Sequence, residues 1–271
     1  MSASKVKNMI LGILILVNIF LLILVVPSRL AAHRQSQKAT QLLEELFLKS
    51  GIQLDVEKMP ASRPLYDQSL SLRSQSQKDA VTALLGGDTT VQEDAGILYF
   101  TANTGSATLE GGRLSAQCRI PTEDPKAFTQ ACLERMEVPF DTVTVQTENN
   151  VTLLACSLSL EDLPVSAEDL IFQYEDGYLT RVTGPLLTKD LALTRSGVQR
   201  CITARDALVE FLGSRMNTGW MGSSITAAQQ IWILNHTADN ENYSLRPAWR
   251  ITTDVGTFLV DGINRSVTLS S

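Results

Sequence analysis

The sequence predicts an α+β protein in which a single N-terminal transmembrane helix precedes tandem units of one helix plus an antiparallel sheet. The run Met9–Val26 is apolar throughout except for Asn18. After it, one helix followed by two or three strands recurs with a weak period of about 70 residues. We expect three parts: residues 1–34 (cytoplasmic tip, anchor and juxtamembrane segment), 35–121 (a first α+β domain) and 122–271 (a second region of two repeats, 122–190 and 198–271).

The apolar run has the length of a membrane helix. Its eighteen residues span about 27 Å as a helix, close to the hydrocarbon thickness of a bilayer. A secretory signal peptide is the alternative, but its apolar core is shorter, and cleavage after Ala32 would put Leu30 at the −3 position. We therefore expect an uncleaved anchor that contacts the lipid bilayer through residues 9–26.

The orientation of the anchor depends on the chain around it. Basic residues flank both ends, so the positive-inside rule does not fix the direction. The acidic chain that follows favours a translocated domain. We expect a single-pass plasma-membrane protein with an extracytoplasmic C-terminal portion, and a tethered cytoplasmic domain is the alternative.

Composition limits the classes of protein and of partner. The chain has 271 residues, 44% of them hydrophobic and 19% charged, as expected for a folded protein with a real core. Its net charge of −6 argues against a nucleic-acid partner. The cysteines have no metal-ligand spacing and His33 and His236 are the only histidines, so we expect no metal. Buried free thiols are favoured over disulfides for Cys118, Cys132, Cys156 and Cys201.

The first domain begins with an amphipathic helix, Ser36–Ser50, whose stripe could serve as a stalk, a dimer seam or one face of a core. A second helix, Ser76–Leu85, ends at Gly86-Gly87. Turn-prone glycines and asparagines separate the strands of this domain. We expect the extended segments to be Ile52–Glu57, Leu65–Leu72, Ile97–Thr101, Ser106–Leu109 and Arg113–Ile120.

The second region opens with a helix that Asp124-Pro125 begins, because proline is favoured at the first helical position. Two strands follow, Thr142–Thr147 and Val151–Leu160, across an Asn-rich turn. A hairpin across Asp176-Gly177 joins Ile171–Tyr174 to Tyr178–Val182, and Asp-Gly is a strong hairpin signal.

The last repeat starts with a capping box formed by Thr203 and Asp206. Trp232 and Trp249 fall within its strands and are expected in the core. Trp220 lies in a glycine-rich segment between helix and strand, where an exposed tryptophan can anchor a partner protein. The expected strands are Ala228–Asn235, Arg246–Thr253 and Gly256–Gly262.

No catalytic constellation is visible in the sequence. Metalloprotease, serine-hydrolase and phosphate-loop motifs are missing. The carboxylates of Asp254 and Asp261 could act as an acid–base pair, but acids around a hairpin are usually turn residues. We expect no catalytic residue, no cofactor and no enzyme activity.

The C-terminal hairpin carries a resemblance. Leu245-Arg246-Pro247-Ala248-Trp249-Arg250-Ile251, followed by Asp254, Gly256-Thr257-Phe258 and Val260-Asp261, resembles the closing hairpin of YycI- and YycH-type proteins and, more loosely, PepSY-like domains. The N-terminal Lys5-Val6-Lys7-Asn8 and Asn18-Ile19-Phe20 are similar to the YycI anchor. The chain departs from the family in its four cysteines and in lacking a glycine-rich end.

This resemblance implies a membrane-anchored regulator of a WalK-type sensor histidine kinase. Asn18 would then contact the partner as an interhelical hydrogen-bond donor, worth about 1 kcal/mol, and Trp220 would be a second contact. An inhibitor or chaperone of a cell-envelope peptidase or lytic enzyme is the alternative, and an envelope hydrolase is a third. Homo- and hetero-dimers are both compatible with the sequence.

Overall fold

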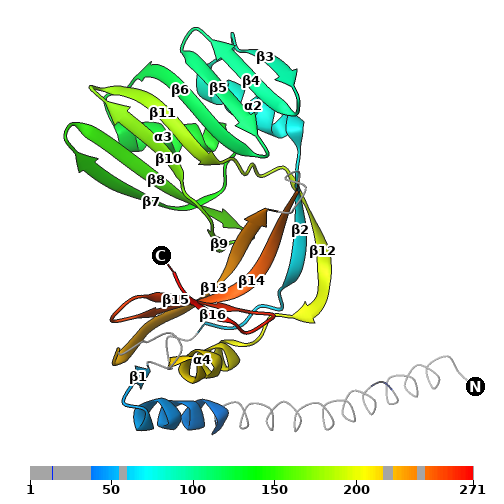
Figure 1. The fold of residues 1–271 in the computed structure, drawn as a ribbon, viewed down its shortest axis with the longest axis vertical. Coiled ribbons are helices and arrows are strands. Elements are labelled where there is room, and N and C mark those ends of the chain that lie inside the picture. The colour runs from blue at the N-terminus through cyan, green and yellow to red at the C-terminus, as the bar shows by residue number, and fades with distance from the viewer. Residues whose placement is uncertain (1–13, 15–37, 55–59, 216–221, 237–241, 271) are drawn as a thin grey trace, which may run out of the picture.

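The computed structural model describes residues 14, 38–54, 60–215, 222–236 and 242–270. Their strands form an upper and a lower lobe (Figure 1). The labelled elements are β1 (Gln53–Leu54), β2 (Tyr66–Leu72), α2 (Ser74–Leu85), β3 (Thr90–Asp94), β4 (Ile97–Ala102), β5 (Gly105–Glu110), β6 (Arg113–Pro121), α3 (Pro125–Arg135), β7 (Phe140–Glu148), β8 (Val151–Leu160), β9 (Leu163–Ser166), β10 (Leu170–Glu175), β11 (Tyr178–Pro185), β12 (Leu191–Arg200), α4 (Ala204–Gly213), β13 (Ser224–His236), β14 (Asn242–Thr253), β15 (Thr257–Asp261) and β16 (Val267–Leu269).

The upper lobe is one antiparallel sheet in the order β3-β4-β5-β6-β11-β10-β8-β7. It contains the same plan twice, a helix followed by a four-stranded meander: α2 with β3–β6, and α3 with β7, β8, β10 and β11. The last strands of the two units, β6 and β11, pair with each other. The first strands, β3 and β7, therefore lie at the two opposite edges (Figure 1).

The lower lobe is built around the hairpin of β13 and β14. One half of β14 pairs with β2 and the other half with β15, and β12 lies beyond β2. β1 and β9 both pair with β13 in the parallel direction. The helix α4 contacts β13, β14 and β15 and covers one face of this sheet.

The upper lobe is inserted into the lower one. The chain leaves the lower lobe where β2 ends at Leu72 and returns where β12 begins at Leu191. The lobes also meet through the β9–β13 pair, in which Val165 lies opposite Trp232. In addition, the Tyr243 hydroxyl donates a hydrogen bond of 2.6 Å to the carbonyl oxygen of Gly111.

Several local predictions are confirmed. The Asp124 carboxylate accepts hydrogen bonds from two backbone N–H groups of the first turn of α3. Thr203 and Asp206 form the complete capping box of α4. Asp176 and Gly177 have φ values of 50° and 80°, as the tight turn between β10 and β11 requires.

The predicted membrane helix is not found. Met9–Val26 lies outside the described residues except for Leu14, a helical residue. Within the described part of the chain, no helix has both the length and the apolar character needed to cross a bilayer. The helix at residues 38–49 buries Leu43 and Phe47 in the core but leaves Leu42 and Leu46 of its apolar stripe exposed, so only part of that stripe packs in a core.

The predicted fold class is also wrong in treating each helix and its strands as a separate unit. Strands of different units join into a large mixed sheet, through β6 with β11, β2 with β14, and the parallel pairs of β13. The physical reason is that every strand edge carries unpaired N–H and C=O groups, which a neighbouring unit can satisfy. The expected boundary between residues 121 and 122 falls at the end of β6, within one continuous sheet.

Candidate functional site

The two predicted contact residues cannot be placed. Asn18 and Trp220 lie outside the described residues, so their roles remain predictions. The other tryptophans are fully buried, as expected for core residues, and the Trp249 indole N–H donates to the Ile202 carbonyl at 3.0 Å.

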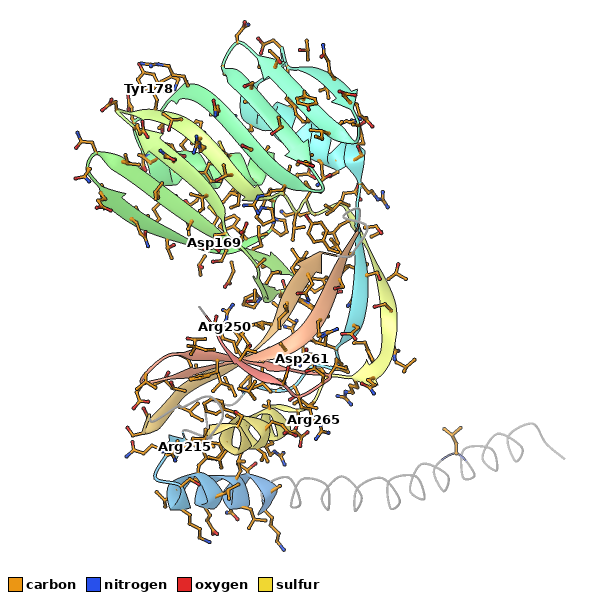
Figure 2. All side chains as sticks on the ribbon, in the orientation of Figure 1. Asp169, Tyr178, Arg215, Arg250, Asp261 and Arg265 are labelled. Atoms are coloured by element: carbon orange, nitrogen blue, oxygen red, sulfur yellow. The ribbon has the colours of Figure 1, made fainter. Side chains whose placement is uncertain are left out.

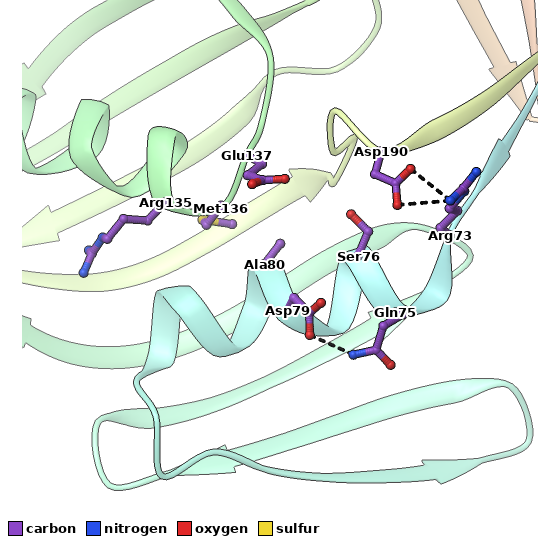
Figure 3. Close-up of a pocket in the computed structure, with 9 residues that line it drawn as sticks. All are labelled: Arg73, Gln75, Ser76, Asp79, Ala80, Arg135, Met136, Glu137 and Asp190. Atoms are coloured by element: carbon purple, nitrogen blue, oxygen red, sulfur yellow. Dashed lines mark hydrogen bonds and ion pairs between the residues drawn. The ribbon is translucent and has the colours of Figure 1, made fainter.

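A polar pocket of about 360 Å³ lies in the upper lobe where the two lobes join. Figure 3 shows it between the start of α2, the end of α3 and the loop before β12. Its lining combines three acidic and two basic side chains with smaller polar and apolar ones: Arg73, Gln75, Ser76, Asp79, Ala80, Arg135, Met136, Glu137 and Asp190.

The polar groups of this pocket bond to one another and to the surrounding fold. Arg73 lies 3.2 Å from an Asp190 oxygen, which ties together the two chain segments that cross between the lobes. Asp79 accepts from Gln75 at 2.8 Å (Figure 3). The Ser76 hydroxyl lies 2.9 Å from that of Thr188. The Arg73–Asp190 contact beside this pocket therefore links the two chain segments that connect the lobes.

The cysteines are free and buried, as expected. Burial raises the pKa of the Cys118 and Cys201 thiols to about 11 and that of Cys156 to about 12. These groups stay protonated near neutral pH, and a thiol is a far weaker nucleophile than a thiolate. Among the described residues no cluster of three His, Cys, Asp or Glu side chains can hold a metal ion.

Asp254 and Asp261 hold different turns in the lower lobe. Asp254 accepts from the Ser223 N–H and hydroxyl at 2.9 and 2.8 Å, and these bonds lower the pKa of its carboxyl. Asp261 (labelled in Figure 2) accepts from two backbone N–H groups and lies 3.2 Å from Arg246. Each carboxylate therefore stabilises its own turn.

A broad surface feature of the described residues is the face of the upper sheet opposite α2 and α3. On β6, Leu114, Ala116 and Cys118 point to the helices and are buried, whereas Ser115 and Gln117 are exposed. The same alternation continues across the sheet, because successive residues of a strand point to opposite faces. Figure 1 shows α2 and α3 on one side of this sheet.

We call the other side the open face. Its central side chains are mainly hydroxyls and amides, with apolar groups toward β7, whereas charged residues of the same alternation, including Glu110, Arg113 and Arg119, lie toward the strand ends. Every one of its members is exposed or half-buried: Tyr99, Thr101, Ser106, Thr108, Ser115, Gln117, Thr142, Thr144, Gln146, Leu153, Ala155, Ile171, Gln173, Arg181 and Thr183.

The open face ends at β7, which pairs with β8 on one side only among the described strands. Figure 1 shows β7 at the rim of the upper lobe. A shallow pocket of about 340 Å³ lies beside its hairpin, lined by Gln146, Glu148, Asn149, Val151 and Leu153. A strand edge of this kind can add a further strand from another chain.

The surroundings of β7 are acidic. Between Arg135 and Arg181 the sequence holds no Lys, Arg or His, while the whole chain has a net charge of only −6. This charge segregation was the signal that could have marked the region from sequence alone. The stretch contains nine acidic residues: Glu137, Asp141, Glu148, Glu161, Asp162, Glu168, Asp169, Glu175 and Asp176.

Comparison with known proteins assigns no family. No protein-family model matches the sequence, and no curated protein matches it. Among solved structures, the chain is similar to the Bacillus megaterium YpeB C-terminal domain, with 10% identity and a TM-score of 0.39 over 74% of this chain and 99% of that one. A likeness this weak carries no conclusion about fold family, partner or activity. The YycI/YycH-type and PepSY-like resemblances therefore stay predictions.

Proposed function

We propose that this protein is a non-enzymatic regulator that acts by binding a partner protein on the extracytoplasmic side of a membrane. The observation that carries the proposal is the open face, a broad sheet surface of hydroxyl, amide and apolar side chains left uncovered by α2 and α3. Its hydroxyl and amide groups can bond to a partner without the cost of removing a charge from water, and Arg181 is a charged member of the same face. Most polar side chains of the pocket at the start of α2, in contrast, are bonded within the fold.

Regulation requires that the partner exist in two states and that the open face bind them with different free energies. A difference of about 1.4 kcal/mol shifts the partner's equilibrium tenfold. The bound surface need not touch the partner's active site, since a ligand that prefers one state shifts the population by itself.

The resemblance of the C-terminal hairpin favours a sensor histidine kinase of the WalK type as this partner. The second candidate is an envelope peptidase or lytic enzyme that the protein inhibits or chaperones. The β7 edge, which no second described strand covers, favours this second candidate, because an enzyme that binds extended peptides or a partly folded client presents strands that can add to a sheet.

The test reconstitutes the full chain with the kinase in vesicles and measures phosphoryl transfer to its response regulator as the chain is titrated. Parallel titrations use the candidate peptidase or lytic enzyme with its own substrate. We expect saturable activation or inhibition of one of them. No change in any of these activities would contradict the proposal.

A matched pair of variants locates the binding surface. Ser115→Arg places a bulky charge on the open face, opposite Thr108 and Thr183, and should raise the half-saturating concentration about tenfold. Gln130→Arg adds the same group to an exposed position of α3 and should leave the titration unchanged. Equal half-saturating concentrations for the two variants would show that the open face is not part of the binding site.

A further inference from the structure

We propose that β7 is the docking edge for an extended, positively charged segment of the partner, which pairs with β7 as a ninth strand of the upper sheet. This inference rests on the proposed function, because it names where and how the partner binds. Three features support it: free backbone groups on β7, the lack of protection at this edge, and the charge around it.

The hydrogen-bonding capacity of β7 follows from its hairpin. Asn149 and Asn150 form a two-residue turn with φ values of 48° and 67°, so Glu148 and Val151 are the pair that closes it. Hydrogen-bonded and non-hydrogen-bonded pairs alternate from there along the ladder. Val143, Val145 and Thr147 consequently turn their N–H and C=O groups away from β8.

A side-chain contact agrees with this assignment. Thr147 and Thr152 lie directly opposite each other, and their hydroxyl oxygens are 3.3 Å apart. Side chains come closest in the non-hydrogen-bonded pairs of an antiparallel ladder. Thr147 is thus one of the residues whose backbone faces outward.

Three other sheet edges in the described part of the chain, β3, β12 and β16, are protected in ways that β7 is not, and a fourth, β1, has only two residues. β3 has five residues and ends in Glu93 and Asp94. The register of β12 breaks between Arg195 and Arg200, and β16 has only three residues. Short length, charge and irregularity are the usual means of preventing a sheet edge from pairing with another chain.

β7, in contrast, has nine residues, and its central segment 142–147 contains no charge, proline or glycine. Its one register shift lies at its start, between Phe140 and Thr142. Val145 is 49% exposed although it lies opposite the buried Leu154, because no described strand covers its outer side. An added strand would cover it with an apolar side chain.

The chemistry of the occupant follows from charge. Asp141 and Glu148 flank the central segment and are both exposed. Among the residues that the structure describes, the only basic side chain in contact with an acidic side chain of this stretch is that of Arg113, which contacts Glu168. Lysines or arginines alternating with apolar residues would therefore satisfy both the acidic flanks and Val145, and long-range attraction would speed association.

A second copy of this chain is the less suitable occupant. Two β7 strands paired with each other would bring together acidic stretches that contain no basic residue, and like charges opposite each other are destabilising. Self-association is therefore an outcome of the test that would overturn the proposal.

The test uses the full chain and labelled peptides, with fluorescence anisotropy as the readout. The probe is a nine-residue peptide of alternating lysine and valine with blocked ends. One control peptide replaces the lysines by glutamates. The other keeps the lysines but replaces two valines by prolines, so that charge is kept and strand formation is lost. We expect only the probe to bind, with an affinity that falls as salt is added.

Variants of Val145 test the edge itself. Val145→Pro removes one outward N–H while leaving the bonds to β8 in place, and should weaken probe binding at least about tenfold. Val145→Thr keeps the N–H and should bind within about twofold of the wild type. Val145→Lys should also weaken binding, because lysine commonly protects natural sheet edges from pairing. This variant replaces Val145→Pro in the test if circular dichroism shows that Val145→Pro does not fold.

The outcomes separate this inference from the proposed function. Unchanged binding by both Val145→Pro and Val145→Lys, equal binding of the glutamate or proline peptide, or no binding of the probe would each overturn the edge proposal. So would a concentration-dependent dimer, seen by analytical ultracentrifugation, that Val145→Lys abolishes. If Ser115→Arg disturbs regulation while all Val145 variants regulate normally, the function stands and the docking edge is wrong.

Discussion

At the scale of single residues, the joint between the lobes depends on a close approach that only glycine allows. Gly112 has a φ of 77°, and a Cβ atom there would lie 2.7 Å from the Tyr243 hydroxyl oxygen and would also overlap the side chain of Leu72. The neighbouring Gly111 carbonyl accepts the hydrogen bond of that same hydroxyl. The turn between β5 and β6 is therefore fitted against the lower lobe.

Gly112→Ala should lower the free energy of unfolding by about 2–4 kcal/mol, because an unfavourable backbone conformation and a steric overlap add together. Gly96→Ala is the matched control. Its φ is 81°, but nothing lies within 4 Å of the added Cβ, so the loss should be about 1 kcal/mol. Urea unfolding measures both, and equal losses would mean that the overlap is relieved without cost.

At the scale of elements, α4 begins with a reciprocal cap. The Thr203 hydroxyl accepts from the Asp206 N–H, and the Asp206 carboxylate accepts from the Thr203 N–H. The helix then buries Ala207, Leu208 and Phe211 against the lower sheet. The cap fixes where this apolar stripe starts.

Thr203→Ala should cost about 1 kcal/mol of stability, because the orphan N–H of the first turn loses its acceptor. Val209→Ala, on the exposed side of the same helix, should change stability by less than about 0.5 kcal/mol. Thermal unfolding by circular dichroism compares the two. A cap variant as stable as the control would show that water replaces the hydroxyl without cost.

Elements were predictable where the signal was local. Asp124-Pro125, Thr203 with Asp206 and Asp176-Gly177 each fix a helix start or a turn within four residues of chain. The sequence also distinguished core from surface, as the burial of Trp232 and Trp249 shows. These features depend on backbone geometry and on side-chain period alone.

Pairing between distant strands was not predictable in the same way. Nothing in the alternation of β6 says that its partner is β11 rather than a strand of its own unit, because any strand of matching period fits the same face. The β7 edge was missed for the same reason, because a strand is recognised as an edge only when the pairing of the other strands is known. The acidic stretch from residue 136 to 180 was visible in the sequence, but its position at the β7 edge follows only from the order of the strands in the sheet.

At the scale of the whole molecule, buried ionisable groups link stability to pH. Burial raises the pKa of the Cys118 and Cys201 thiols to about 11, from an ordinary value of 9.0, and that of the Tyr243 hydroxyl to about 12, from 10.0. The folded chain therefore holds these protons more tightly than the unfolded chain does. Stability is fully present below pH 9 and is lost as the pH rises toward 11 and 12.

We expect the urea midpoint to stay level from pH 7 to about pH 8.5 and to fall steadily above pH 9. Tyr243→Phe lacks one of the shifted groups, so its decline above pH 10 should be shallower than that of the wild type. Tryptophan fluorescence can follow the transition because Trp232 and Trp249 are buried. A midpoint that is unchanged up to pH 11 would contradict the assignment.

The insertion of the upper lobe also has a consequence for the order in which the protein is assembled. On the ribosome, β2 emerges before either of its neighbours β12 and β14, which lie more than a hundred residues later in the chain. The upper lobe contains all the partners of its own antiparallel sheet and can complete that sheet first. β2 therefore remains without β12 and β14 while the upper lobe folds. The lower lobe completes its sheet only after the C-terminal hairpin of β13 and β14 has been synthesised.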